Sequence, residues 1–195
     1  MYPNFRSTIA LQVFSGLLLI AIGCGKYSQY TAKIVGARLA NANNSGKVPY
    51  AMGNGATIKA NTYAIALYLQ SVIYKKDGNK DVQGETTFGL SNNATGVIIV
   101  TLTDFNARHS TGADMADCFA FVNDTLAYQL HPMDSSVFSA KWTFHNSPSP
   151  TDTFYSNNYF ILMQPPDAPG NYRFAVNVNF ADSTQFNDTL NVYLK

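Results

Sequence analysis

The chain has 195 residues, of which 13% are charged, with 13 Lys and Arg against 12 Asp and Glu. Soluble proteins are typically about 25% charged, and so small an excess of positive charge argues against a nucleic-acid binder, which needs a strongly basic surface. Two cysteines exclude a disulfide-dense scaffold, and the length suits one domain after an export signal.

The first 23 residues have the layout of an export signal. Arg6 is followed by an apolar run from Ile9 to Ile22 and then by Gly23 and Cys24. The run is shorter than the roughly 20 residues that a membrane-spanning helix needs. It resembles a bacterial lipoprotein signal, although such signals usually carry Leu at the position of Ala21.

The resemblance implies a lipoprotein signal peptide at residues 1–23, lipidation of Cys24 and a lipidated tether at residues 24–31. Two or more acyl chains would hold the protein stably to a bilayer. The predicted location is the cell envelope, as an outer membrane lipoprotein. The periplasmic face is favoured over the cell surface, because no acidic residue directly follows Cys24. An ordinary secretory signal and a transmembrane anchor are the alternatives.

Charge is unevenly distributed after Cys24. Seven basic residues and no acidic residue occur between Cys24 and Lys76, and Asp77 is the first acid of the chain. The basic segment could face anionic lipid headgroups. The other interpretation, which we favour, is that acidic strands lie beside it and cancel its charge.

Residues 32–195 are predicted to form a single all-β domain, an antiparallel β-sandwich. Tyr63, Ile65, Leu67 and Leu69 recur at every second position, which predicts a strand within residues 57–74. Residues 96–103 are apolar on both faces and predict a central strand. Turn-rich segments separate the other predicted strands, at residues 32–39, 88–90, 118–122, 137–144 and 159–163.

Residues 104–117 form the densest polar segment. Asp104, Asn106, Asp114 and Asp117 could supply oxygen ligands to calcium, but their spacing does not match an EF-hand loop. The favoured interpretation is a loop in which Asp114 or Asp117 caps a turn. Cys118 follows, in an apolar strand, and is predicted to be a small core residue rather than a nucleophile. We expect no catalytic residue, no metal and no cofactor.

Aromatic residues are the remaining candidates for a binding site. Residues 147–155 are rich in Ser, Pro and Thr and are predicted to be exposed. Phe154 and Tyr155 at the end of this segment, together with Tyr159, are the candidate ligand-binding residues, because aromatic side chains contribute large contact areas. Trp142 is predicted to lie in the core.

The C-terminal residues give the clearest fold signal. Phe174, Val176, Val178 and Phe180 alternate in one strand, and Leu190, Val192 and Leu194 alternate in the next, which predicts a hairpin. Tyr172 follows Pro169-Gly170 at the start of the penultimate strand. This arrangement resembles the tyrosine corner of immunoglobulin-like and fibronectin-like domains, in which the hydroxyl bonds to nearby backbone.

The whole chain resembles the uncharacterised bacterial lipoproteins that carry an immunoglobulin-like β-sandwich domain. The resemblance implies no active site. The function expected is therefore a non-enzymatic, lipid-anchored envelope module for adhesion, assembly or ligand capture. The alternative is a carbohydrate-binding or degradative accessory lipoprotein. The expected partners are the membrane, through Cys24, and an unknown protein or glycan.

Overall fold

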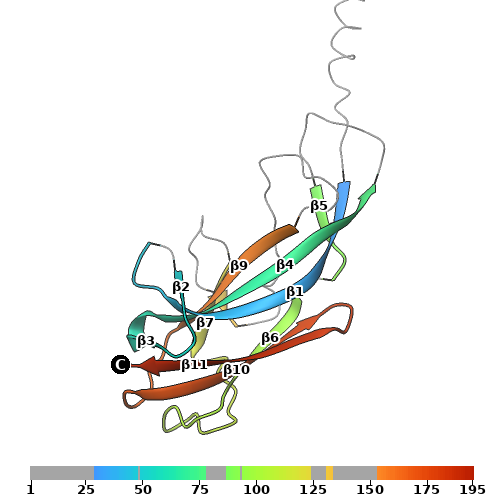
Figure 1. Cartoon of the computed structure of the whole chain (residues 1–195). Helices are drawn as coiled ribbons and strands as arrows, with labels where there is room; N and C mark the ends of the chain where they lie inside the picture. The colour runs from blue at the N-terminus through green and yellow to red at the C-terminus, as the bar shows by residue number, and fades with distance from the viewer. Residues whose placement is uncertain (1–28, 48, 78–86, 93, 124–130, 134–152) are drawn as a thin grey trace, which may run out of the picture.

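A computed structural model describes residues 29–47, 49–77, 87–92, 94–123, 131–133 and 153–195, which form two sheets packed face to face (Figure 1). In spatial order, the larger sheet contains β2 (Tyr50–Met52), β1 (Gln29–Asn43), β4 (Tyr63–Asp77), β9 (Thr153–Leu162), β7 (Phe119–Asn123) and β8 (His131–Pro132), with β5 (Thr87–Leu90) beside β1. The smaller sheet contains β3 (Ala56–Ile58), β11 (Gln185–Leu194), β10 (Gly170–Phe180) and β6 (Ala94–Thr101).

The order of the strands is that of an immunoglobulin-like sandwich. Strands β1-β4-β9-β7 match the A-B-E-D sheet, and β6-β10-β11 match the C-F-G sheet. All pairs are antiparallel except β1 with β5 and β3 with β11. The predicted all-β sandwich is therefore confirmed, with two short parallel pairs that the sequence did not predict. Among the described residues, no helix is long and apolar enough to cross a membrane.

The core between the sheets comes from the alternating residues. Tyr63, Ile65, Leu67 and Leu69 of β4 are at most 3% exposed, and the alternating apolar residues of β10 and β11 are buried opposite them. The ring of Tyr63 stacks on that of Phe174 with their centroids 5.8 Å apart. The hairpin predicted from residue spacing is confirmed, because β10 and β11 pair from Gly170 and Leu194 to Asn179 and Gln185.

The tyrosine corner is also confirmed. The Tyr172 hydroxyl donates a hydrogen bond of 2.6 Å to the carbonyl oxygen of Ala168, four residues earlier. Its ring packs edge-on against Phe105, with the centroids 5.3 Å apart. The corner therefore fixes the segment that leads from β9 into β10.

The prediction of a central strand at residues 96–103 is wrong. Strand β6 ends at Thr101 and is at the edge of the smaller sheet, where its one strand partner among the described residues is β10. Ile99 is fully buried, but Ile98 is 44% exposed on the outer face. The apolar run Ile98–Val100 predicts burial on both faces of the strand, but the outer face, which carries Ile98, is exposed to solvent.

The observed bounds of two other segments also differ from the predicted ones. Strand β1 begins at Gln29, inside the segment predicted as a tether, and the segment 57–74 divides into β3, a short 3-10 turn named η1 (Ala60–Thr62) and β4. Residues 1–28, with Cys24, and the predicted strand 137–144, with Trp142, lie outside the described residues.

The sandwich has two distinct ends (Figure 1). At one end, where β1 starts, the ammonium group of Lys33 lies 3.4 Å from Asp182 in the turn between β10 and β11. At the far end, the side-chain amide of Asn41 in β1 donates to the carbonyl oxygen of Asn191 near the end of β11. Strands β2 and β3, η1 and the last residues of β11 gather there.

Candidate functional site

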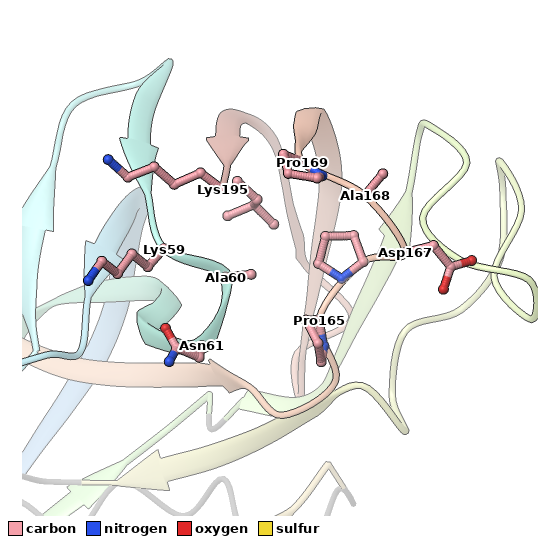
Figure 2. A pocket seen from close by; sticks show the side chains of 10 residues that line it. Lys59, Ala60, Asn61, Pro165, Asp167, Ala168, Pro169 and Lys195 are labelled. Atoms are coloured by element: carbon pink, nitrogen blue, oxygen red, sulfur yellow. The ribbon is translucent and has the colours of Figure 1, made fainter.

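The far end carries an open groove of about 590 Å³ between the tyrosine corner and η1 (Figure 2). Pro165, Pro166, Ala168 and Pro169 form one wall. The other wall contains Ala60, Asn61, Leu194 and the two lysines Lys59 and Lys195. Figure 2 shows the two ammonium groups at one margin and the Asp167 carboxylate turned away at the other. The middle of the groove is therefore apolar.

Both walls of the groove are held by hydrogen bonds. The Asp167 carboxylate accepts a hydrogen bond of 2.8 Å from the backbone N–H of Ala107. The backbone N–H of Asp167 donates one of 3.2 Å to the carbonyl oxygen of Phe105. On the other side, the N–H of Ala60 donates to the carbonyl of Lys195. A groove fixed in this way loses little conformational entropy when it binds a partner.

The polar loop at residues 104–117 satisfies its own backbone. The carboxylate of Asp104 accepts from the backbone and hydroxyl of Thr111, and Asp114 accepts from the N–H of Ala116. The side-chain oxygen of Asn106, Oδ1, accepts from the backbone N–H of Arg108. These side chains bind separate groups instead of converging, so the turn-capping interpretation is confirmed for Asp114 and the geometry gives calcium no support.

The same loop contains a cluster that sequence analysis missed. Nδ1 of the His109 ring lies 2.9 Å from Oδ1 of Asn106, and Nε2 lies 2.8 Å from Oδ1 of Asp117. The sulfur of Cys118 lies 3.7 and 3.8 Å from the two ring nitrogens. The sulfur is therefore nearly equidistant from the two ring nitrogens, and each nitrogen already contacts a side-chain oxygen.

The electrostatics of the cluster favour a structural role. Burial, together with the nearby Asp117 carboxylate, raises the pKa of the Cys118 thiol to about 11. The thiol is fully buried and stays protonated at neutral pH, so it is a poor nucleophile and metal ligand. Although desolvation opposes it, the hydrogen bond and charge of His109 hold the pKa of Asp117 below its ordinary value. Cys118 is thus a core residue, as predicted.

The three predicted aromatic residues do not form one described site. Phe154 and Tyr155 lie in β9, opposite Ser71 and Gln70 of β4, and their side chains are not among those described. Tyr159 is 4% exposed on the outer face of the larger sheet, where it packs with Ala42, Ala64, Ala66, Val122 and Ile161. Burial and the neighbouring Tyr68 raise the pKa of Tyr159. A ligand-binding role for the three residues stays a prediction.

The fold is an immunoglobulin-like β-sandwich with an open groove at one end. Residues 37–191 match the family described as Domain of unknown function (DUF5034), and the chain belongs to that family. Among curated proteins, none matches the sequence.

Two solved structures give matches over most of the chain. They are the C-terminal domains of the Streptococcus pyogenes antigen I/II-family protein AspA and of the Streptococcus agalactiae AgI/II polypeptide BspA. Their sequence identities are 8% and 10%, and the matches cover 82% and 81% of this chain, each with a TM-score of 0.30. The chain spans 46% and 49% of those structures.

Proposed function

We propose that this protein is a non-enzymatic binding module of the cell envelope, held to a membrane by lipid on Cys24. It serves adhesion, assembly or ligand capture through its far end. The observation that carries the proposal is the position of β1, which begins at Gln29, five residues after Cys24, and runs to the far end.

The length of β1 gives the reach of the module. Its 15 residues span about 50 Å at about 3.3 Å per residue. A lipid on Cys24 would therefore hold the end of the sandwich where β1 starts, here called the anchor end, at the bilayer and leave the groove at the opposite end. The groove is then presented to molecules beyond the membrane surface.

Two features favour binding over catalysis. Catalysis needs titratable groups that converge in a concave site, whereas the groove combines prolines and alanines with two lysines at its margin. The titratable cluster of His109, Asp117 and Cys118 is held in a structural arrangement with a protonated, buried thiol. Apolar walls with few polar groups are typical of binding sites.

Carbohydrate binding is the second candidate function. It is favoured by a separate polar hollow on the outer face of the larger sheet, which contains Arg38, Tyr68 and Gln70. This hollow is distinct from the groove at the far end.

The anchor is tested by growing cells with an alkyne-labelled fatty acid and comparing the wild type with Cys24→Ala. We expect label and membrane association in the wild type and loss of both in Cys24→Ala. Cys118→Ala is the matched control and should keep both, because that thiol is buried. An unlabelled wild type, or a labelled Cys24→Ala variant, would overturn the lipid anchor.

A further inference from the structure

The hollow on the outer face of the larger sheet is a candidate ligand site. It has a volume of about 420 Å³ and is lined by Gly36, Ala37 and Arg38 of β1 and by Tyr68 and Gln70 of β4. The pairing of the two strands places Gly36 opposite Gln70 and Arg38 opposite Tyr68. These four residues, here called the Arg38 hollow, form two adjacent rows on one face of the sheet.

A β-bulge creates the hollow. The register of β1 against β4 shifts between Ile34 and Gly36, so Val35 is an extra residue in β1. Ile34 and Leu39 are both buried in the core, although they are five residues apart and would face opposite ways in a regular strand. The bulge therefore turns Gly36 and Arg38 outward, as bulges at functional sites do.

Gly36 provides the floor of the hollow. A Cβ atom at this position would lie 3.3 Å from Oε1 of Gln70, which is closer than ordinary van der Waals contact. Any larger side chain would occupy the space beside Gln70. The absence of a side chain at residue 36 thus keeps the hollow open.

The polar side chains of the hollow are oriented and available. The Arg38 guanidinium lies over the Tyr68 ring, 4.9 Å from its centroid, which restricts its rotamers while leaving its N–H groups free to donate. Within the described part of the chain, Arg38 forms no ion pair, and the side chains of Tyr68 and Gln70 form no hydrogen bond.

The surroundings favour an anionic ligand. Between residues 29 and 76, the segment that contains β1 and all but the last residue of β4, the sequence has basic residues and no acidic one. The one described ion pair of β1 joins Lys33 to Asp182, and the acid at the end of β4, Asp77, lies opposite Gln29, nine residues before Arg38. Arg38 therefore lacks a protein counter-charge, and a carboxylate could bind its guanidinium through two parallel hydrogen bonds.

The side chains of the hollow favour a sugar as the ligand. An extended peptide binds in the plane of a sheet, at an edge, and β1 has such an edge at residues 35–40, where no described strand pairs with its outer side. The hollow itself opens on the face of the sheet, between β1 and the fully paired β4, where a ligand meets side chains. The amide of Gln70 and the hydroxyl of Tyr68 suit ligand hydroxyl groups, and exposed Asn157 of β9 lies opposite Tyr68 in the next strand.

We propose that the Arg38 hollow binds a carboxylate-bearing sugar residue of the uronic acid type. The carboxylate pairs with Arg38, and the ring hydroxyls bind Gln70 and Tyr68. The inference rests on the second candidate function, carbohydrate binding, and names a ligand class for it; it does not depend on the groove at the far end. The inference does not depend on lipidation of Cys24. A negative result in the fatty-acid labelling experiment would therefore leave the sugar site standing, and a negative result in the sugar titration would leave the lipid anchor standing.

The test is calorimetric titration of the full-length protein, purified in neutral detergent, with trigalacturonic acid. We expect saturable binding, a loss of affinity of about tenfold or more in Arg38→Ala, and a smaller loss in Arg38→Lys, which keeps the charge without the planar fork. Gln70→Ala should also weaken binding. Arg173→Ala is the matched control, since Arg173 is an exposed strand residue of the other sheet, and it should bind as the wild type does.

Two further ligands separate the interpretations. The methyl ester of trigalacturonic acid has the same shape without the charge and should bind at least tenfold more weakly. Triglutamate has the charge without the sugar rings. Equal affinity for triglutamate and trigalacturonic acid, unchanged binding in Arg38→Ala with a wild-type circular dichroism spectrum, or no binding by the wild type would each overturn the proposal.

Discussion

Asn41 is a fully buried polar residue that joins four segments of the far end. Its side-chain amide donates to the carbonyl oxygens of Gly53 and Asn191, and its Oδ1 accepts from the Tyr63 hydroxyl at 3.1 Å. Tyr63 is itself completely buried, and burial raises the pKa of its phenol. A satisfied polar group in a core fixes one arrangement of its neighbours, because any other leaves it unpaired.

Asn41→Leu should lower the free energy of unfolding by about 2–3 kcal/mol, since it removes three hydrogen bonds and leaves the buried Tyr63 hydroxyl unpaired. Tyr63→Phe removes one of those bonds together with the hydroxyl and should cost about 1 kcal/mol. Urea denaturation of both variants measures the difference. Equal losses would show that the network contributes no more than one bond.

Sequence analysis could not find Asn41 or His109 because their roles depend on distant partners. Asn41 bonds to Asn191, 150 positions away, and an Asn among turn-forming residues predicts a loop. His109 and Cys118 are nine residues apart, in a spacing that matches no known ligand pattern. Tyr172 was found because its partner, Ala168, lies only four residues earlier.

At the scale of elements, the loop at residues 104–117 supports the groove wall and should be sensitive to acid. The Asp104 carboxylate accepts hydrogen bonds from the backbone N–H of Thr111 and from its hydroxyl, and these bonds, the first more than the second, hold the pKa of Asp104 below its ordinary value. A carboxylate whose pKa is lower in the folded state stabilises the fold above its unfolded pKa. That contribution is lost as the pH falls through the folded pKa.

Asp104→Asn keeps an oxygen acceptor for Thr111 and removes the charge. The melting temperature of this variant should therefore fall less steeply than that of the wild type as the pH is lowered below about 4. Thermal melts of the wild type and the variant at a series of acid pH values give the comparison, and identical slopes for the two proteins would contradict the role of Asp104.

Strand β1 explains why the fold could be predicted from the sequence while the Arg38 hollow could not. Alternation in β4, β10 and β11 is regular, so residue spacing alone assigns their buried faces. In β1 the bulge at Val35 reverses the alternation, and the apolar residues Ile34 and Leu39 fall out of phase. A period-two analysis of β1 therefore places Arg38 on the wrong face.

At the scale of the whole molecule, the proposed attachment through Cys24 would determine what the protein can reach. Lys33 pairs with Asp182 at the anchor end, and Asn41 bonds to Asn191 at the far end, so β1 and β11 run side by side along the sandwich. If lipid holds Cys24, the turn between β10 and β11 faces the bilayer. The groove beside η1 then points away from it.

Energy transfer to the membrane can test this orientation. A donor dye is placed on Gln185→Cys, at the anchor end, or on Asn61→Cys, at the far end, in protein bound to vesicles that contain an acceptor lipid. Both positions are exposed, and the dye should spare Cys118, whose buried thiol has a pKa of about 11. Transfer should be strong from residue 185 and weak from residue 61, because the 10 residues of β11 between the two ends span about 33 Å at about 3.3 Å per residue. Equal transfer from both positions would mean that the sandwich lies flat on the bilayer, and the groove would then be as close to the membrane as the anchor.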